Sequence, residues 1–515
     1  MPNIRTPKGL MVLVEFFQLT SLSVANRSNK FRKNQYIKQT NAHKKRQQHE
    51  RILKQAARQQ AIYQRMSWRD YQKSLNHPKI FHMRFRRILI GIAGVSMALG
   101  LYFVLPRLTE NNTSPYRQTV DLPIENSVYK APVSIELKKT NLRSLLDDQK
   151  LLNLTAENFE LTYKEQPYLI ETSLDPDLQT AMIDHFDKVN SRYIGIVAMN
   201  PETGRILAFT GFNKTKTDLN PCTTNKFPAA SIFKIITAAA ASEKLGYSGD
   251  TQMKFNGQKH TLYKIQLKDR ENRYTNRVSF RNSFAQSINP VFGKIGSLKL
   301  GKETLLKYGE AFGFNHSFNT EIKIAPSHLN VTEDSYQWAE VACGFNRDTT
   351  LSPIHAAIIA STTLNGGQII EPTIIDRVVD ASGQVVYNNG SKPAYHHVIS
   401  ARTSDMIQKM METTVRSGTA HKTFRGYSRD EVLKKLVIGG KTGTIYNKVH
   451  DARFDWFVGF AKTKDRSEKM VISVVVAHEE YIGRRAGEYA WIAFKTHFKN
   501  YFAKKEAKQR LQEKS

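Results

Sequence analysis

The sequence predicts an α+β fold in which helices flank one mostly antiparallel sheet. Two observations predict this fold. Apolar runs of strand length stand at both ends of the region from residue 168 to residue 503, and a long, mostly helical stretch separates them. Because strands and helices that are segregated along the chain are typical of an α+β domain, we expect the sheet to draw its strands from both ends of this region.

The first two strands are predicted as a hairpin over residues 191–212, where residues 201–204 form a Pro- and Gly-containing turn between two apolar runs. A predominantly helical middle follows, and it includes residues 229–245. Toward the end of the chain, three apolar runs are predicted as strands and one amphipathic stretch as the last helix, at 436–439, 454–461, 469–477 and 490–503.

Positive charge is concentrated before residue 88. The chain of 515 residues has a formal net charge of +30. Roughly half of this excess lies in residues 26–87, where Glu50 and Asp70 are the only acids. Such a stretch suits an anionic membrane surface or a nucleic acid. A nucleic-acid role rests on charge alone, so we expect no specific nucleic-acid partner.

Residues 88–105 follow the basic stretch at once and contain no charged residue. As a helix they would be about 27 Å long at about 1.5 Å per residue, which is close to the thickness of the hydrocarbon core of a bilayer. The 87 residues before this run are too many for a cleaved secretory signal, so an uncleaved single-pass signal anchor is predicted. Because the basic side stays in the cytoplasm, everything after Pro106 is expected across the membrane.

The chain contains two cysteines, Cys222 and Cys343, both on the predicted exported side, where one disulfide and two unpaired thiols fit the sequence about equally well. No metal-ligand spacing occurs, so neither a metal nor another cofactor is expected. Five parts are predicted along the chain: a basic cytoplasmic tail (1–87), a transmembrane signal anchor (88–105), a linker or small pedestal with short strands such as 133–137 (106–167), the main domain (168–503) and a basic C-terminal tail (504–515).

Ser231 and Lys234 are the candidate nucleophile and base. They lie three residues apart in a helix that is predicted to begin at Pro228, so the Lys234 amine can reach the Ser231 hydroxyl. A serine needs a base to take its proton, and a lysine can serve when burial lowers its pKa enough to leave it neutral. The same spacing at Ser127 and Lys130 is flanked by prolines and is not predicted to be helical.

Lys441, Thr442, Gly443 and Thr444 contain the only Lys-Thr-Gly sequence of the chain, directly after a predicted strand. The glycine lets a ligand approach the strand backbone closely. The lysine and the threonines offer a charge and hydroxyls to a carboxylate. Taken alone, the pattern is also typical of an ordinary polar strand edge with a glycine bulge.

Ser287 and Asn289 complete the candidate residues. They lie in a helix-like segment that ends at Pro290. Two other Ser-x-Asn sequences, at 74–76 and 317–319, fall in the predicted cytoplasmic tail and in a predicted loop. The Ser287 pattern is therefore the one that lies in an exported helix between the other two motifs.

The order Ser-x-x-Lys, Ser-x-Asn and Lys-Thr-Gly, on helix, helix and strand, resembles the three motifs of the penicillin-binding transpeptidase and serine β-lactamase superfamily. The similarity extends over most of residues 168–500. Three further segments resemble the start of the transpeptidase domain, its Gly-Thr-Ala loop and the strand after Lys-Thr-Gly in bifunctional members, at 172–179, 418–420 and 455–460.

Two features depart from the bifunctional members. Ile445 stands where these commonly have a second threonine after Lys-Thr-Gly-Thr, so contacts with the acceptor or with ligands are expected to differ. The motifs of a glycosyltransferase domain are absent, and the stretch of about 65 residues between the predicted span and the main domain is too short for one. The resemblance therefore implies a monofunctional protein, served by a separate glycosyltransferase.

The resemblance implies a peptidoglycan DD-transpeptidase that acts on stem peptides ending in D-Ala-D-Ala and is covalently inhibited by β-lactams. Lys234 would take the Ser231 proton, and Ser231 would attack the carbonyl of the penultimate D-Ala. The backbone N–H groups of Ser231 and Thr444 would form the oxyanion hole. An amine of a neighbouring stem peptide would then resolve the acyl-enzyme.

The remaining motif residues have implied roles as well. Ser287 would relay a proton to the leaving D-Ala amine, and Asn289 would hydrogen-bond Lys234 and the substrate backbone. Lys441, with the hydroxyls of Thr442 and Thr444, would hold the terminal carboxylate.

The resemblance also implies a single-pass protein of the bacterial cytoplasmic membrane, with the N-terminus in the cytoplasm and the catalytic domain on the extracytoplasmic, periplasmic side. Three alternatives stay open. Water in place of the acceptor amine would make the protein a DD-carboxypeptidase, and rapid hydrolysis of the penicilloyl adduct would make it a β-lactamase. A non-catalytic scaffold would keep the fold and recruit partners through residues 1–87.

Overall fold

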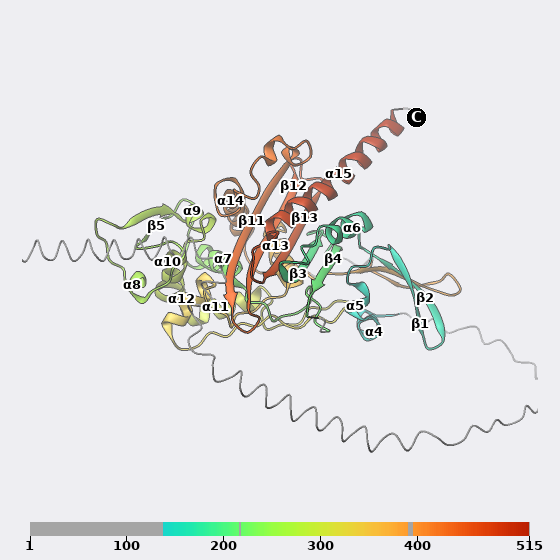
Figure 1. Ribbon diagram of the computed structural model, residues 1–515, viewed down its shortest axis with the longest axis horizontal. Helices are drawn as coiled ribbons and strands as arrows, with labels where there is room; N and C mark the ends of the chain where they lie inside the picture. The colour runs from blue at the N-terminus through green and yellow to red at the C-terminus, as the bar shows by residue number, and fades with distance from the viewer. Residues whose placement is uncertain (1–136, 216–217, 390–394, 514–515) are drawn as a thin grey trace, which may run out of the picture. The chain divides into compact units, whose positions relative to one another are not determined.

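Residues 137–215, 218–389 and 395–513 are described by a computed structural model of the chain (Figure 1). They belong to the second of two compact units, Ile124–Ser515. Within these ranges no helix combines the length and the apolar character needed to cross a membrane.

Several predictions fall outside the described residues. These are the basic tail, the signal anchor at 88–105, the second serine–lysine spacing at Ser127 and all but the last residue of the strand at 133–137. They stay predictions.

A five-stranded sheet forms the centre of the described unit, in the order β11-β12-β13-β3-β4. Every neighbouring pair is antiparallel, and the strands come from both ends of the main domain, which confirms the predicted α+β fold. The strands are β3 (Ser191–Met199), β4 (Ile206–Asn213), β11 (Leu436–Asn447), β12 (Ala452–Thr463) and β13 (Lys469–His478).

The edge strand β11 is much longer than the predicted strand at 436–439. Its pairing with β12 continues through Thr444, opposite Asp455, and ends at Asn447, opposite Ala452. The apolar run marks only the first part of the strand, because backbone pairing continues where the side chains become polar. The Lys-Thr-Gly sequence therefore lies inside an edge strand and not after one.

Helices cover both faces of this sheet (Figure 1). Side chains alternate along β12, so that Trp456 packs into the core on one face and Phe457 into the core on the other. The helix against the first face is α13 (Pro353–Leu364), those against the second are α6 (Pro176–Asp184) and α15 (Ala486–Gln512), and α14 (Ala401–Ser417) runs along β11.

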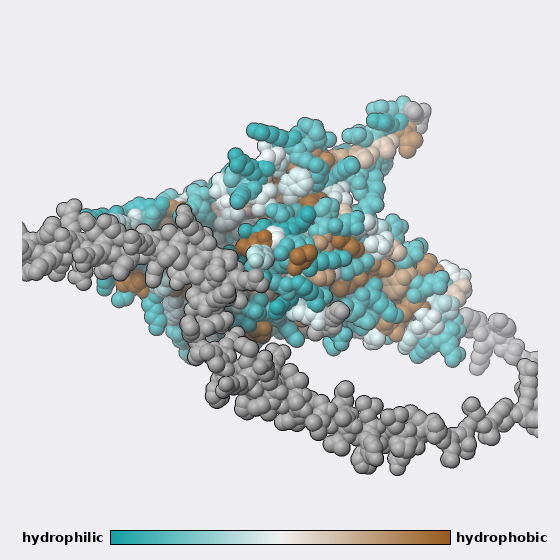
Figure 2. Space-filling model, viewed as in Figure 1, coloured by the Kyte–Doolittle hydropathy of each residue, from teal (hydrophilic) through white to brown (hydrophobic). Residues whose placement is uncertain are grey.

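Helix α15 is longer at both ends than the predicted helix at 490–503. It begins at Ala486, where the Asp455 carboxylate accepts the backbone N–H of Ala486 at 3.0 Å. It continues to Gln512, since residues 503–512 contain no Gly or Pro and are mostly good helix formers. The predicted C-terminal tail is therefore mostly helical. Figure 1 shows this end of the helix leaving the sheet, and Figure 2 shows it as mostly hydrophilic.

A second, four-stranded sheet stands beside the main one and is missed by the sequence reasoning. Its order is β1-β2-β8-β9, and it joins residues that are about 200 positions apart in the chain. β2 runs across the predicted boundary between residues 167 and 168. The buried Glu321 ties this sheet to the body, because it accepts hydrogen bonds from Thr373 and Tyr387. The strands are β1 (Asn158–Tyr163), β2 (Gln166–Thr172), β8 (Ile375–Asp380) and β9 (Val385–Asn388).

The remaining elements are short or belong to the helical middle. Two helices precede β1, and two antiparallel strand pairs (β5 with β6, and β7 with β10) interrupt the middle. These elements are α4 (Lys139–Leu145), α5 (Asp148–Leu151), the 3₁₀ turn η2 (Ala230–Phe233), α7 (Lys234–Leu245), β5 (Gln252–Phe255), α8 (Lys264–Leu267), β6 (Asn276–Ser279), α9 (Phe280–Ala285), α10 (Asn289–Lys294), the π turn η3 (Ile295–Leu300), α11 (Gly301–Ala311), α12 (Ser335–Cys343), β7 (Gln368–Ile370), β10 (Tyr395–His397), η4 (Tyr427–Arg429) and η5 (Leu433–Lys435).

Candidate active site

Ser231 lies in the 3₁₀ turn η2, directly before α7. The predicted start of an α-helix at Pro228 is wrong, because Pro228 forms a β-bridge with Thr350 and Ala230 has a φ of 48°. The α-helix proper begins at Lys234. The serine is therefore presented by a tight turn that the chain enters from a strand-like segment.

Lys234 is fully buried and its amine lies at the centre of the site. Its Nζ donates to Ser231 Oγ at 2.7 Å, to Asn289 Oδ1 at 2.8 Å and to the Cys343 carbonyl at 2.6 Å. Burial lowers the pKa of Lys234 to about 8, because the ammonium form loses its hydration. The predicted reach from Lys234 to Ser231 is confirmed, and so is the contact with Asn289.

Ser287 lies in a turn between α9 and α10, not within a helix as predicted. Its φ is 54°, a left-handed conformation that is unusual for a residue other than glycine. Asn289 begins α10, and its Nδ2 donates to the His260 carbonyl at 3.0 Å. Because of this turn, the Ser287 hydroxyl and the Asn289 amide point into the same site.

Lys441 is also fully buried. Its Nζ donates to Ser287 Oγ at 3.0 Å and to the Thr442 carbonyl at 2.7 Å. Burial, together with the positive charge of Lys234, holds the pKa of Lys441 well below its usual value. Within the described ranges, neither Lys234 nor Lys441 forms an ion pair with a carboxylate.

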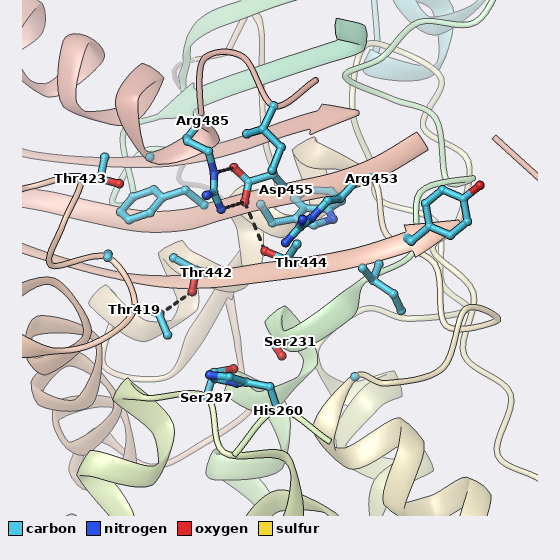
Figure 3. A pocket seen from close by; sticks show the side chains of 18 of the residues that line it. Ser231, His260, Ser287, Thr419, Thr423, Thr442, Thr444, Arg453, Asp455 and Arg485 are labelled. Carbon is cyan, nitrogen blue, oxygen red and sulfur yellow. Dashed lines mark hydrogen bonds and ion pairs between the residues drawn. The ribbon is translucent and has the colours of Figure 1, made fainter. Parts of the chain in front are cut away.

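The hydroxyls of Thr442 and Thr444 lie on the other face of β11. Thr442 pairs with the hydroxyl of Thr419, and Thr444 Oγ1 donates to Asp455 Oδ1 at 3.3 Å (Figure 3). Because side chains alternate along a strand, Lys441 and the two hydroxyls do not converge on one point. The arrangement expected for a terminal carboxylate is thus split across the edge strand.

Two glycines let the segments of the site approach closely. A β-carbon at Gly443 would stand 3.3 Å from the Ala230 Cβ and 3.4 Å from the Ser231 nitrogen, so Gly443 makes room for the nucleophile turn. Gly344 has a φ of 65°, and a β-carbon there would overlap the Ala230 carbonyl at 1.8 Å. Gly344 therefore fixes the segment whose Cys343 carbonyl accepts from Lys234.

On the far face of β11, Asp455 is buried and paired. Arg485 binds both of its oxygens, from Nη2 to Oδ1 at 2.8 Å and from Nε to Oδ2 at 2.9 Å. These bonds, with the backbone N–H of Ala486, hold the pKa of the Asp455 carboxyl well below its usual range even though burial acts in the opposite direction. No sequence motif indicated this pair.

A cleft with a volume of about 910 Å³ opens along β11 and contains the candidate residues Ser231, Ser287, Asn289, Thr442 and Thr444. His260 also lines it, beside Ser287 and facing Ser231 in Figure 3. Burial and the charge of Lys234 lower the pKa of His260 from its usual value. Sequence reasoning missed His260, since a lone histidine before a small helix carries no signal by itself.

Both cysteines are buried and free, so the disulfide alternative is not realised. In the described part of the chain, no group of three or more His, Cys, Asp or Glu side chains could hold a metal ion. The chemistry that this site supports is that of an activated serine. A hydroxyl that is hydrogen-bonded to a buried amine of lowered pKa can lose its proton to that amine and attack a carbonyl carbon.

Known proteins with related sequences include penicillin-binding proteins and peptidoglycan D,D-transpeptidases. Stage V sporulation protein D of Bacillus subtilis is 27% identical over 341 residues, which cover 59% of this chain and 49% of that protein. Peptidoglycan D,D-transpeptidase PbpA of Mycobacterium tuberculosis is 23% identical over 353 residues, which cover 60% of this chain and 67% of that protein. The chain thus spans about half the length of the first relative.

Solved structures share the fold. The D,D-transpeptidase domain of a peptidoglycan glycosyltransferase from Eggerthella lenta has a TM-score of 0.53 at 20% identity and covers 64% of this chain and 83% of its own. The penicillin G acyl-enzyme complex of penicillin-binding protein A from M. tuberculosis has a TM-score of 0.51 at 20% identity and covers 64% and 80%.

The family pattern that describes the penicillin binding protein transpeptidase domain matches residues 194–497. This range contains the three motifs and the whole five-stranded sheet except the first residues of β3. Since it is more than half of the chain, the protein belongs to the penicillin-binding protein transpeptidase domain family.

Proposed function

We propose that this protein is a peptidoglycan D,D-transpeptidase that works through an acyl-enzyme on Ser231. The observation that carries the proposal is the hydrogen bond of 2.7 Å between the Ser231 hydroxyl and a fully buried lysine amine. The names of the relatives support the substrate class, and acyl-enzyme complexes with β-lactams in solved structures of the same fold support the covalent step.

In the acylation step, neutral Lys234 takes the Ser231 proton while Oγ attacks the carbonyl carbon of the penultimate D-Ala. The negative charge that develops on the carbonyl oxygen is met by the backbone N–H groups of Ser231 and Thr444. The proton passes to the leaving nitrogen, the C–N bond breaks, and the terminal D-Ala departs as a neutral amine.

Ser287 and Asn289 together contact both lysines, and we assign to Ser287 the transfer of that proton. Its hydroxyl accepts from Lys441, and Asn289, two residues later, accepts from Lys234. When Lys441 is protonated it favours an anionic ligand, since no carboxylate within the described ranges pairs with it. Deacylation reverses the sequence: an acceptor amine gives a proton to Lys234 and attacks the ester carbon, the C–O bond to Ser231 breaks, and Lys234 returns the proton to Ser231 Oγ.

The test is covalent labelling. The full chain in detergent should take up one fluorescent penicillin per molecule, and intact mass should show the adduct. The Ser231→Ala variant should fold and remain unlabelled. A folded wild-type protein that takes up no penicillin would contradict the proposal.

The lifetime of the adduct separates the remaining alternatives. A transpeptidase should keep the penicilloyl group for an hour or more, whereas a β-lactamase should lose it within seconds. With a stem-peptide donor, release of D-Ala in the absence of an acceptor amine would indicate a DD-carboxypeptidase. Penicillin uptake without turnover of any peptide donor would favour the non-catalytic scaffold.

We further propose that residues 88–105 anchor the protein in the bacterial cytoplasmic membrane, with the catalytic domain outside and a separate glycosyltransferase supplying the glycan strands. The uncharged run after a basic stretch supports this placement. In spheroplasts, an external protease should remove the catalytic domain and leave a tag at the N-terminus intact. Protection of the catalytic domain would contradict the placement.

A further inference from the structure

The cleft holds a cation that the proposed mechanism does not use. Arg453 lies on β12, directly opposite Tyr446 and on the same face as Asp455, and it lines the cleft. Figure 3 shows its side chain extending toward Thr444. Its guanidinium forms no hydrogen bond or ion pair with any residue of the described ranges. An arginine has five donors, and this one has all of them available to a ligand.

The neighbouring carboxylate does not satisfy Arg453, because Asp455 is already occupied. Its oxygens accept from both arms of Arg485, from the Ala486 N–H and from the Thr444 hydroxyl. Partial burial and the charge of Arg485 lower the pKa of the Arg453 guanidinium. The cleft as a whole has more cationic than anionic side chains, with Arg347, Lys422, Arg453 and Arg485 against Asp455 and Glu488.

A bound peptide would pass this cation on its acyl side. β11 is an edge strand, so an extended peptide can pair with it as an additional strand. If Lys441 and Ser287 take the terminal carboxylate, the acyl part of the donor runs the other way, toward Ile445 and Tyr446. Strands lie about 4.8 Å apart, so β12 is about 10 Å from such a peptide, a gap that an arginine and an acidic side chain bridge together.

We propose that Arg453 forms a subsite for a carboxylate carried on the acyl side of the donor peptide. The proposal rests on the proposed function, because it names the ligand chemistry of that same cleft. It predicts that the protein distinguishes donors with a free side-chain carboxylate from donors in which that carboxylate is amidated. A bidentate guanidinium–carboxylate pair supplies such a distinction, since an amide offers only one oxygen and no charge.

The test uses penicillins whose 6-acyl side chain ends in a carboxylate, at three chain lengths (glutaryl, adipyl and pimelyl), each matched with its terminal carboxamide. The measured quantity is the second-order acylation rate constant of the carboxylate divided by that of the carboxamide. Because both compounds meet the same protein sample, the ratio is insensitive to the fraction folded. For the wild type we expect a ratio of about 10 at one length or more.

The Arg453→Gln variant should bring this ratio close to one, and Arg453→Lys should leave an intermediate value, since it keeps the charge and loses the fork. Arg402→Gln, an exposed arginine in the first turn of α14 and outside the cleft, is the matched control and should keep the wild-type ratio. A wild-type ratio near one at every length, or a ratio that Arg453→Gln leaves unchanged, would overturn the subsite alone. Failure of every penicillin to acylate the wild type would overturn the proposed function as well.

Discussion

The two faces of β11 and β12 hold buried charge in opposite ways. On the face toward Ser231, Lys234 and Lys441 are fully buried, and neither is paired with a carboxylate among the described residues. On the face toward α15, Asp455 is buried and bound through both oxygens by Arg485. The register places Lys441 on β11 and Asp455 on β12 within a few residues of one another.

The difference shows what each face does. A buried ammonium without a counter-charge is driven toward its neutral form, and the pKa of both lysines is accordingly lowered. A neutral amine can take a proton, so this face is suited to chemistry. The Asp455 carboxyl is driven toward its charged form by Arg485, so its face locks α15 to the sheet. Activity should depend on the first face and stability on the second.

The largest effect is expected from Lys234→Met, which keeps the volume of the side chain and removes the base. Acylation by benzylpenicillin should fall by about 10⁴-fold, as measured by stopped-flow quenching or intact mass. The free energy of unfolding should change little, because the lost hydrogen bonds are offset by removal of a buried cation.

The control is Lys244→Met, an exposed lysine on the same helix, which should keep the wild-type acylation rate. If Lys234→Met were acylated within tenfold of the wild type, the base would be another group. If it unfolded, Lys234 would be structural as well.

The second largest effect is expected from Asp455→Asn. The free energy of unfolding should fall by about 2–3 kcal/mol, because the hydrogen bonds that Arg485 and the Ala486 N–H make to the buried carboxylate lose their charge, and urea denaturation would measure this. The carboxyl pKa is depressed in the folded protein, so its stabilisation is present at neutral pH and is lost only as the pH falls through the folded value.

The acid sensitivity that Asp455 contributes should therefore be absent from the variant. Asp405→Asn, which breaks an exposed pair with Lys409, should cost less than about 1 kcal/mol. If Asp455→Asn and Asp405→Asn lowered the free energy of unfolding equally, the face toward α15 would not owe its stability to the buried Asp455 pair.

The smallest effect is expected from Thr444→Val. Its hydroxyl donates to the buried Asp455 carboxylate, so its loss should lower the free energy of unfolding by about 1–2 kcal/mol. The hydroxyl of Thr442 pairs with the neutral Thr419 hydroxyl, so Thr442→Val should cost less. If Thr442→Val lowered the free energy of unfolding more than Thr444→Val in thermal or chemical denaturation, the stability of the face toward α15 would not depend on the Asp455 charge.

Sequence reasoning found the motif residues because their spacing fixes their geometry. Ser231 and Lys234 are three positions apart, and this separation brings the amine to the hydroxyl in a 3₁₀ turn as well as in an α-helix. The central sheet was found for a similar reason, since its strands are apolar and joined mostly by short turns. Their ends were missed where polar residues continue the pairing.

The parts that were missed depend on residues brought together from distant segments. The Cys343 carbonyl accepts a hydrogen bond from Lys234, which is 109 positions away in the chain. The need for a glycine at position 344 is visible only in the folded chain, where the Ala230 carbonyl packs against it. The sheet of β1, β2, β8 and β9 pairs half-exposed strands whose polar sequence resembles a linker. Arg485 and Asp455 are 30 positions apart, and although Asp455 begins the segment 455–460 that resembles family members, nothing in that segment indicates Arg485 as its partner.

The pH dependence of acylation tests the central claim most directly. Lys234 must be neutral to act as the base, and its pKa in the folded protein is about 8. The second-order rate constant for benzylpenicillin should therefore rise about tenfold per pH unit below this value and level off above it. In the His260→Asn variant the rate constant should level off at the same pH, because the pKa of that histidine lies below its usual value. A rate that is flat from pH 6 to 10, or a break that disappears with His260, would contradict a neutral buried lysine as the base.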